Sequence, residues 1–334
     1  MSDLTLTKKD FTSDQEVRWC PGCGDYSILS TMQAYLPELG VPRENIVFVS
    51  GIGCSSRFPY YLETFGMHSI HGRAPTIASG LAIARPDLTV FVVTGDGDAL
   101  SIGGNHLIHS LRRNVNLKIL LFNNRIYGLT KGQYSPTSEQ GKITKSTPLG
   151  SLDAPFNPIS LALGAEASFV ARTVDSDRKH FTDVLRQASA HKGSALIEIF
   201  QNCPIFNDGA FDSVKDSTSK GAALLQMVHG QAIKSDTHGL IHEGASLKVV
   251  ELSSVSEDQL VIHDAHNADP SYAFALSRLS ASALDHVPVG VFRDVERSEY
   301  GSQVNNQIAD IISKQGAGDL KTLLESGDTW VVEK

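Results

Sequence analysis

Residues 88–124 read LTVFVVTGDGDALSIGGNHLIHSLRRNVNLKILLFNN, and this stretch decides the fold. Its first part, residues 88–94, is a nearly continuous run of apolar and β-branched residues, the pattern of a strand buried on both faces of a parallel sheet. Gly95-Asp96-Gly97 ends that run. Apolar residues then recur at helical spacing over residues 98–113, and a second apolar run, 117–122, ends at Asn123-Asn124. The stretch therefore predicts a strand, a helix and a second strand.

The two strand ends together predict a metal-diphosphate site. A right-handed crossover brings the carboxyl ends of both strands to one edge of the sheet, so we expect Asp96 and Asn124 to lie close together. A carboxylate, an amide oxygen and a nearby carbonyl are hard ligands that fill about half of an octahedral Mg²⁺ shell and leave positions for phosphate oxygens. Gly95 and Gly97 let a phosphate approach the main chain, and helix amides beginning near Asp98 favour negative charge. Either motif alone would be ordinary turn chemistry, but the pair is far more specific.

This stretch resembles the signature of thiamine diphosphate (ThDP) enzymes that runs from Gly-Asp-Gly to Asn-Asn. In those enzymes the aspartate, the second asparagine and a carbonyl two residues later bind the metal, which implies Asp96, Asn124 and the carbonyl of Ile126 as Mg²⁺ ligands. The following loop, 127–130, is expected either to line the pocket or simply to lead into a helix. The expected cofactor-binding residues are Gly53, Gly95, Asp96, Gly97, Asp98, Asn124, Leu129 and Thr130.

The overall composition excludes several classes of protein. The 334 residues include 29 basic and 37 acidic side chains, and the net charge of −8 argues against non-specific binding of nucleic acid. No apolar run approaches the ~18 residues of a membrane span, and the N-terminal MSDLTLTKKDF lacks the apolar core of a signal peptide. We therefore expect a cytoplasmic protein without membrane contact, in which the four cysteines are ligands or free thiols rather than disulfides.

All four cysteines lie in predicted turns. Cys20 and Cys23 share one tight turn, whereas Cys54 and Cys203 each follow a strand-like apolar run. A four-thiolate site suits either tetrahedral zinc or a [4Fe-4S] cluster, and unrelated buried thiols are a third interpretation. Spacing alone does not separate zinc from iron–sulfur. A redox cluster next to a carbanion-forming cofactor would have an electron-transfer purpose, which favours the [4Fe-4S] interpretation.

Further motifs make the resemblance closer: Trp19-Cys-Pro-Gly-Cys-Gly, Gly51-Ile-Gly-Cys-Ser-Ser, His71-Gly-Arg-Ala, Gly95-Asp-Gly-Asp, Asn124-Arg-Ile-Tyr-Gly-Leu-Thr, Gly132-Gln-Tyr-Ser-Pro-Thr and Asn202-Cys-Pro. Residues 17–212 resemble the β subunit of 2-oxoacid:ferredoxin oxidoreductases, most closely of the 2-oxoglutarate type. The resemblance implies that Cys20, Cys23, Cys54 and Cys203 bind one [4Fe-4S] cluster. It also implies ThDP-dependent oxidative decarboxylation of 2-oxoglutarate to succinyl-CoA and CO₂, in which coenzyme A (CoA) takes the acyl group and ferredoxin takes the electrons. Pyruvate or another 2-oxoacid is the alternative substrate.

Two further residues are candidates for substrate contacts. Arg57 follows Cys54 by three residues, and its guanidinium could bind the distal carboxylate of a dicarboxylic 2-oxoacid, which would favour 2-oxoglutarate over pyruvate. An ordinary surface arginine is the alternative. His71, in a turn with Gly72 and Arg73, is a candidate for a polar contact to substrate, although a lone histidine is more often structural.

The sequence lacks one group that ThDP chemistry requires. A carboxylate must face the aminopyrimidine of the cofactor, and Glu63, the only local competitor, reads as a core-flanking or surface residue. The resemblance implies that a separate α subunit supplies this glutamate, in an α2β2 assembly. The rival hypothesis is a non-catalytic, zinc-stapled module that binds a nucleotide or a protein partner.

The expected fold is α/β, with a doubly wound, mostly parallel sheet of the ThDP-binding type complete by residue 205. It occupies residues 1–210, and a smaller C-terminal region, 211–334, is expected to dock a subunit. Helices are expected at 26–36, 74–84, 157–163, 176–191 and 305–313, and strands at 46–50, 169–172, 195–200, 247–252, 260–263 and 289–293. Residues 131–147 are expected to form a long loop, and residues 212–220 a linker.

Overall fold

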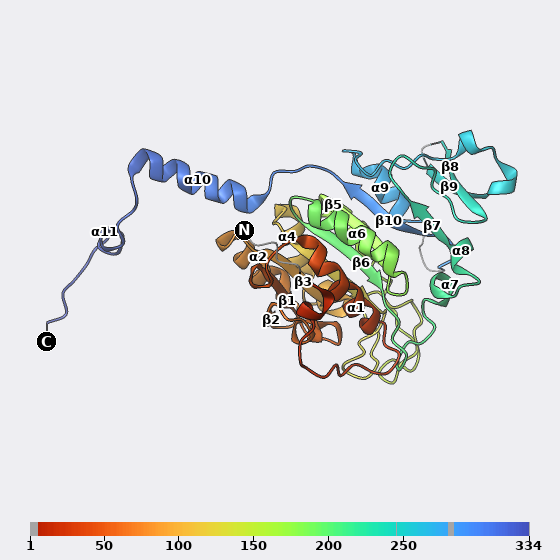
Figure 1. Ribbon diagram of the computed structural model, residues 1–334, viewed down its shortest axis with the longest axis horizontal. Helices are drawn as coiled ribbons and strands as arrows, with labels where there is room; N and C mark the ends of the chain where they lie inside the picture. The colour runs from red at the N-terminus through yellow and green to blue at the C-terminus, as the bar shows by residue number, and fades with distance from the viewer. Residues whose placement is uncertain (1–5, 245, 280–283, 334) are drawn as a thin grey trace.

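A parallel sheet lies at the centre of the computed structural model, which describes residues 6–244, 246–279 and 284–333 (Figure 1). Among these residues, eight strands form this sheet in the order β2-β1-β3-β4-β6-β5-β10-β7. Neighbouring strands are parallel except β5 and β10, which run antiparallel. The strands are β1 (Ile46–Ser50), β2 (Phe65–His68), β3 (Thr89–Gly95), β4 (Lys118–Asn123), β5 (Phe169–Val174), β6 (Ala195–Phe200), β7 (Leu224–Met227) and β10 (Val287–Asp294).

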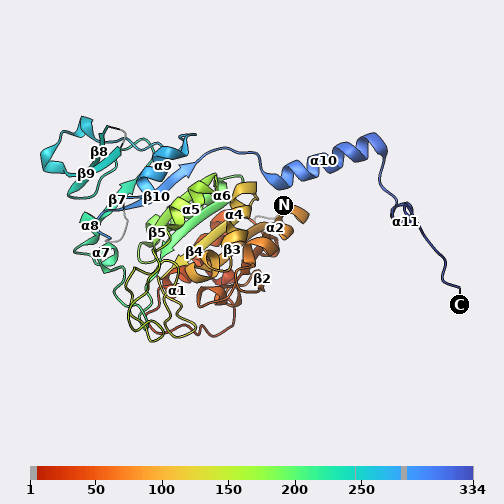
Figure 2. The same cartoon turned by 180° about the vertical axis from the view of Figure 1, so that it is seen from behind.

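Helices cover both faces of the sheet because successive strand residues point to opposite sides. In β3, Phe91 and Val93 belong to the core cluster beneath α1 (Asp25–Tyr35) and α6 (Arg178–Ala190), which face the viewer in Figure 1. Val90 and Val92 belong to the cluster on the opposite face, seen in Figure 2. That face is covered by α2 (Ala74–Ala84), α4 (Gly104–Arg113) and α5 (Pro158–Gly164). The predicted doubly wound architecture is confirmed.

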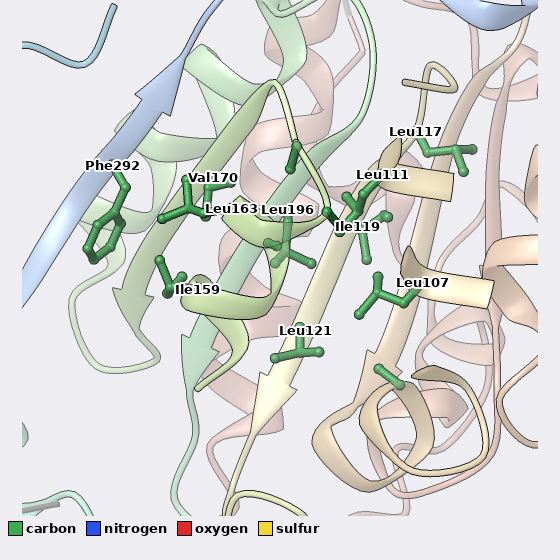
Figure 3. Packing of buried hydrophobic residues seen from close by; sticks show 14 of the residues in the cluster. Leu107, Leu111, Leu117, Ile119, Leu121, Ile159, Leu163, Val170, Leu196 and Phe292 are labelled. Atoms are coloured by element: carbon green, nitrogen blue, oxygen red, sulfur yellow. The ribbon is translucent and has the colours of Figure 1, made fainter. Parts of the chain in front are cut away.

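The second face shows how the helices are held. Leu107 and Leu111 of α4 and Ile159 of α5 pack against Ile119 and Leu196 of the central strands (Figure 3). Each of these five side chains is at most 1% exposed, and full burial of such a side chain is worth about 1.5–3 kcal/mol. The apolar residues that recur at helical spacing in the sequence are therefore the residues with which these helices contact the sheet.

The predicted single helix over residues 98–113 is wrong. The chain instead forms α3 (Asp96–Leu100), a break, and then α4. The break brings two backbones into contact, because a Cβ added to Gly72 would lie 2.6 Å from the nitrogen of Gly103. A Cβ on Gly103 would lie 2.4 Å from the carbonyl oxygen of Asp98. Glycine at positions 72 and 103 permits this close approach, and glycine is a poor helix former, which suits the break.

The sheet is not complete by residue 205, because β10 and β7 extend it beyond β5. The division at residue 210 remains a prediction, but it does not separate two independent sheets. The expected linker at 212–220 contains α7 (Asp212–Lys215) and the start of α8 (Lys220–Ala223). The expected strand at 260–263 is also wrong, since Leu260 and Ile262 form only isolated bridges. A separate antiparallel hairpin pairs β8 (His238–Glu243) with β9 (Ser246–Glu251).

The remaining elements are helices and one long loop. As predicted, residues 131–147 contain no helix or strand. Helix α9 (Pro270–Ser277) packs near β10, while α10 (Tyr300–Gln315) and α11 (Leu320–Leu324) extend away from the body (Figures 1 and 2). Short 3₁₀ helices span Lys8–Phe11, Leu36–Leu39, Arg43–Asn45, Ser55–Tyr61, Leu252–Ser254 and Glu257–Gln259. Within the described ranges, no helix is both long and apolar enough to cross a membrane.

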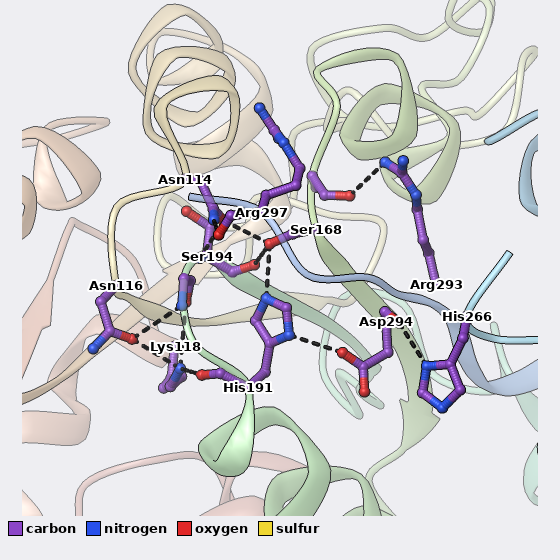
Figure 4. A network of polar contacts seen from close by, with 12 residues as sticks. Asn114, Asn116, Lys118, Ser168, His191, Ser194, His266, Arg293, Asp294 and Arg297 are labelled. Atoms are coloured by element: carbon purple, nitrogen blue, oxygen red, sulfur yellow. Dashed lines mark hydrogen bonds and ion pairs between the residues drawn. The ribbon is translucent and has the colours of Figure 1, made fainter. Parts of the chain in front are cut away.

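A buried polar network at the amino edge of the sheet fastens the segment that precedes α10 (Figure 4). His191 Nε2 lies 2.7 Å from Ser168 Oγ, and His191 Nδ1 lies 2.8 Å from Asp294 Oδ1. The Ser168 hydroxyl donates to Asn114 Oδ1 (2.5 Å), and Asn114 Nδ2 donates to the carbonyl of Arg297 (3.0 Å). Although this row has the order of a Ser-His-Asp triad, Ser168 is fully buried. The row is therefore structural.

Candidate functional site

The carboxyl ends of β3 and β4 meet at one pocket, as the sequence predicts. Gly95 pairs with Phe122 in the parallel register, so the Asp96 and Asn124 that follow these strands reach the same edge. Both residues line a pocket of about 600 Å³, which we call the strand-end pocket. Its lining includes the predicted Gly53, Cys54, His71, Gly95, Asp96, Gly97, Asp98, Asn124, Ile126, Leu129 and Thr130.

Asp96 is one of two buried aspartates that line this pocket. Its side chain belongs to a residue that is only 2% exposed, and burial raises its pKa to about 6. Two hydroxyls, Ser135 Oγ at 2.5 Å and Thr137 Oγ1 at 2.6 Å, donate to Asp96 Oδ2 and favour the charged form. At neutral pH the carboxylate is therefore available to a cation. Neither hydroxyl was assigned a role from the sequence.

The turn after β4 supplies the other oxygen ligands that the sequence predicts. Asn124 Oδ1 accepts a hydrogen bond from the backbone nitrogen of Ile126 (3.2 Å), and Asn207 Nδ2 donates to the Asn124 carbonyl (2.9 Å). Arg125 between them has φ +55°, a left-handed conformation that is uncommon for a residue other than glycine. Carboxylate, amide and carbonyl oxygens at one pocket suit Mg²⁺ by their chemistry.

Gly97 makes room for an aromatic ring. The hydroxyl of Tyr127 donates to the carbonyl of Gly97 (3.0 Å), and a Cβ on Gly97 would lie 2.2 Å from Tyr127 Cε1. The sequence predicts that Gly97 lets a phosphate approach the main chain, and the structure adds this second reason for a glycine. Gly53, at φ +140°, has open space where a Cβ would be.

Asp98 lines the pocket, but its carboxylate is bound by the protein. It accepts hydrogen bonds from the backbone nitrogens of Gly72 (2.7 Å) and Ile52 (3.1 Å) and from Thr94 Oγ1 (2.6 Å). A Cβ on Gly51 would lie 1.9 Å from Asp98 Oδ2, so only glycine fits there. Asp98 therefore joins the loops at Ile52 and Gly72 to the end of β3, and its direct contact with a cofactor remains a prediction.

His71 stands at the mouth of the pocket. Its Nδ1 lies 2.7 Å from Asp98 Oδ1, a close contact that does not meet the geometry of a hydrogen bond. The side chain is 37% exposed, so the ring is both anchored and open to the pocket. This placement suits the predicted polar contact to a substrate, which remains a prediction.

Leu129 and Thr130 line the rim of the pocket. Leu129 is 44% exposed, and the Thr130 hydroxyl bonds the side chain of Gln133. The backbone of Tyr127 also pairs with Gln133. The loop therefore turns back along the pocket and does not lead into a helix, which supports the first of the two expectations for residues 127–130.

The four cysteines gather beside this pocket. A Cβ added to Gly128 would lie 3.5 Å from Cys203 Sγ and 3.6 Å from Cys54 Sγ, so the glycine faces both sulfurs. A Cβ on Gly22, in the turn between Cys20 and Cys23, would lie 3.9 Å from a side-chain carbon of Pro204, which follows Cys203. Trp19 Nε1 donates to the carbonyl of Cys54 (2.7 Å). The three segments that carry the predicted ligands thus lie next to one another.

The surroundings of the thiols are buried and negative. Burial, followed by the nearby Asp25, raises the pKa of Cys54 to about 12 and the pKa of Cys23 further still. Asp25 itself is 1% exposed, and burial raises its pKa to about 7. Gln201 Nε2 donates to Cys23 Sγ (3.2 Å). Free thiolates are disfavoured here, so a cationic iron–sulfur core that neutralises four thiolates fits this donor set.

Two findings limit the metal assignments. In the part of the chain that the structure describes, no three His, Cys, Asp or Glu side chains are grouped closely enough to hold a single metal ion. Arg57 lies outside the strand-end pocket, in a surface pocket with Glu16 and Tyr60, and its guanidinium donates to the carbonyl of Arg18 (3.3 Å). The structure does not bring Arg57 and the Mg²⁺ candidates to one pocket.

Known proteins resemble this chain along most of its length. Residues 51–199 match the family model described as "Thiamine pyrophosphate enzyme, C-terminal TPP binding domain", where thiamine pyrophosphate is another name for ThDP. The chain is 61% identical to 2-oxoglutarate oxidoreductase subunit KorB of Mycobacterium tuberculosis over 337 aligned residues, which cover 99% of this chain and 90% of that relative.

Two further relatives support the same comparison. The chain is 47% identical over 192 residues to 2-oxoacid:ferredoxin oxidoreductase subunit beta of Saccharolobus solfataricus, covering 57% of this chain and 63% of that relative. It also resembles a solved structure, 2-oxoglutarate:ferredoxin oxidoreductase from Magnetococcus marinus with 2-oxoglutarate, coenzyme A and succinyl-CoA bound. There the TM-score is 0.76 at 31% identity, with 98% of each chain covered.

Proposed function

The chain belongs to the β subunits of the 2-oxoacid:ferredoxin oxidoreductases, of the 2-oxoglutarate type, and from this membership we propose that it holds ThDP, Mg²⁺ and one [4Fe-4S] cluster. The reaction is the oxidative decarboxylation of 2-oxoglutarate to succinyl-CoA and CO₂. One observation supports the assignment most strongly: Asp96, which is buried, lines the same pocket as Asn124 and Cys54.

Asp96, Asn124 and the carbonyl of Ile126 would hold Mg²⁺, which in turn would hold the diphosphate. When bound, ThDP supplies a carbanion that attacks the keto carbon and a ring that accepts the electrons released with CO₂. The protein must bind and orient both reactants. Gly95 and Gly97 would let the diphosphate approach the main chain. Leu129 and Thr130 would contact the cofactor at the rim of the strand-end pocket.

Cys20, Cys23, Cys54 and Cys203 would hold the cluster next to the same pocket. Cys54 is the link, because it belongs to both groups of residues: it lines the pocket and lies with Cys203 beside Gly128. Electrons from the substrate would thus have a short route to an external ferredoxin, and CoA would take the succinyl group. His71, open to the pocket, would make a polar contact with the substrate.

A partner subunit completes the site in this proposal. Glu63, the only local candidate for the aminopyrimidine carboxylate, is exposed and lies in a different pocket with Arg43 and Phe65. We propose that an α subunit supplies the required glutamate in an α2β2 assembly. Membership of this enzyme family favours the proposal over the rival hypothesis of a non-catalytic zinc-stapled module.

The proposal is tested by comparing the purified chain with the chain plus its α subunit. We expect iron and acid-labile sulfide in the chain alone, and CoA-dependent ferredoxin reduction only with both subunits. Among a panel of 2-oxoacids, 2-oxoglutarate should give the highest kcat/KM, with pyruvate as the runner-up. Zinc without sulfide, or turnover by the chain alone, would contradict the proposal.

A further inference from the structure

Residues 131–147, which the sequence predicts only as a loop, reach the proposed cation site. Ser135 and Thr137 are 2% and 4% exposed, and both hydroxyls donate to the same oxygen, Asp96 Oδ2, at 2.5 and 2.6 Å. Among the described residues, no side-chain hydrogen bond reaches the other carboxylate oxygen, Oδ1. The two hydroxyls therefore leave one oxygen of Asp96 for a ligand.

A row of buried side chains lies beside Thr137. Its Oγ1 also lies 2.8 Å from Asn123 Oδ1. Asn123 Nδ2 donates to Glu198 Oε1 (2.7 Å), which sets the orientation of the amide, and Arg172 Nε donates to Glu198 Oε2 (2.7 Å). Asn123, Glu198 and Arg172 stand on the adjacent strands β4, β6 and β5. The acceptor Asn123 Oδ1 is thus held beside Thr137 by the sheet.

Ser135 is positioned from the other side, by the turn that carries Asn124. The backbone nitrogen of Ser135 donates to Ser138 Oγ (2.8 Å), and the Ser138 hydroxyl donates to the carbonyl of Arg125 (2.6 Å). Arg125 lies between Asn124 and Ile126, the two other candidates for Mg²⁺ ligands. The same short segment therefore contacts both halves of the proposed ligand set.

We propose that Ser135 and Thr137 are positioning residues for Asp96. The terminal torsion of an aspartate is broad, so two donors on Oδ2 are an effective way to select one orientation of the carboxylate. Thr137 has one hydroxyl proton and two acceptors, and the bond to the ionised carboxylate is the stronger one. This inference rests on the proposed function, because it assumes that Asp96 binds the cation.

The test measures cation binding directly. In the full chain, Mn²⁺ replaces Mg²⁺, since the same hard oxygen ligands accept it. Free Mn²⁺ is counted by electron paramagnetic resonance in the presence of saturating ThDP, before and after the α subunit is added. Loss of a residue that orients a metal ligand typically weakens metal affinity 10–100-fold. We expect that increase in Kd for T137V, which has nearly the shape of threonine, and for S135A.

Two further variants separate positioning from packing. T137S restores the hydroxyl without the methyl group and should bind Mn²⁺ nearly as tightly as the unchanged chain. T144V is a matched control on the same loop, because among the described residues the Thr144 hydroxyl bonds only Ser146 (3.2 Å) and Thr147 (2.7 Å). Thermal unfolding of every variant without Mn²⁺ shows whether a lower affinity reflects a damaged fold.

The outcomes distinguish this inference from the proposed function. Weaker binding by T137V and S135A, with rescue by T137S and no change in T144V, would support the positioning role. Equal affinities for T137V and T144V, while D96N loses binding, would overturn the positioning role and leave the proposed function standing. Unchanged binding by D96N would overturn both.

Discussion

Replacing Gly97 with alanine tests why this position is a glycine. The backbone at Gly97 is not left-handed, so alanine is allowed there by conformation. A Cβ would however lie 2.2 Å from Tyr127 Cε1 and 2.5 Å from Cζ. Carbon atoms in contact are about 3.5–4.0 Å apart, so the ring must move by more than about 1 Å. Overpacking of this kind typically costs about 1–3 kcal/mol.

We therefore expect G97A to lower the free energy of unfolding by about 2 kcal/mol. The displaced ring lines the strand-end pocket, so the affinity for ThDP should fall as well. In Y127L, the smaller side chain loses the hydrogen bond to the Gly97 carbonyl, worth about 1 kcal/mol. The double variant G97A/Y127L removes the clash, so the two changes should be less than additive by about 1–2 kcal/mol.

Urea unfolding of the unchanged chain, G97A, Y127L and the double variant measures this coupling, with every sample holding the same amount of cluster per chain. Calorimetry with ThDP and Mg²⁺ measures the affinity of each protein for ThDP. Additive effects on stability would refute the steric argument. Loss of ThDP affinity in G97A with unchanged stability, and no recovery in G97A/Y127L, would show that the phosphate needs the bare main chain at this position.

Three further predictions concern other parts of the chain. Burial lowers the pKa of Lys118 to about 8. Between pH 8 and 10.5 the Lys118 amine therefore binds fewer protons in the folded chain than in the unfolded chain. The free energy of unfolding should accordingly rise with pH in that window, by about 1.4 kcal/mol per pH unit. This rise should be absent from K118M in urea titrations at several pH values. Replacing Arg57 with methionine should raise KM for 2-oxoglutarate more than for pyruvate if Arg57 binds the distal carboxylate; an equal change would remove that role. Deleting residues 300–334 removes the exposed Ile308, Ile311 and Ile312 from one side of α10, and should weaken co-purification with the α subunit while ThDP binding persists. Undiminished co-purification would place the subunit contact elsewhere.

Much of the fold could be predicted because its determinants are local. The apolar runs of β1, β3, β4 and β6 are continuous, since both faces of these strands are buried. The meeting of Asp96 and Asn124 also follows from local order, because consecutive parallel strands end at the same edge. The proximity of the cysteine-bearing segments was harder to foresee, because only Cys54 and Cys203 follow strands, whereas the turn with Cys20 and Cys23 precedes α1.

What the sequence by itself determined was thus the order of the elements, the edge of the sheet where the chemistry lies, and the residue types that gather there. Only the tertiary structure decided that β10 inserts antiparallel beside β5, that Asp98 turns inward, and that the helix after Asp96 is broken. It also decided that Ser135 and Thr137, 39 and 41 residues from Asp96, supply its hydrogen bonds. The physical reason is that contacts between distant segments depend on how the whole sheet packs, and no periodicity within one segment records them.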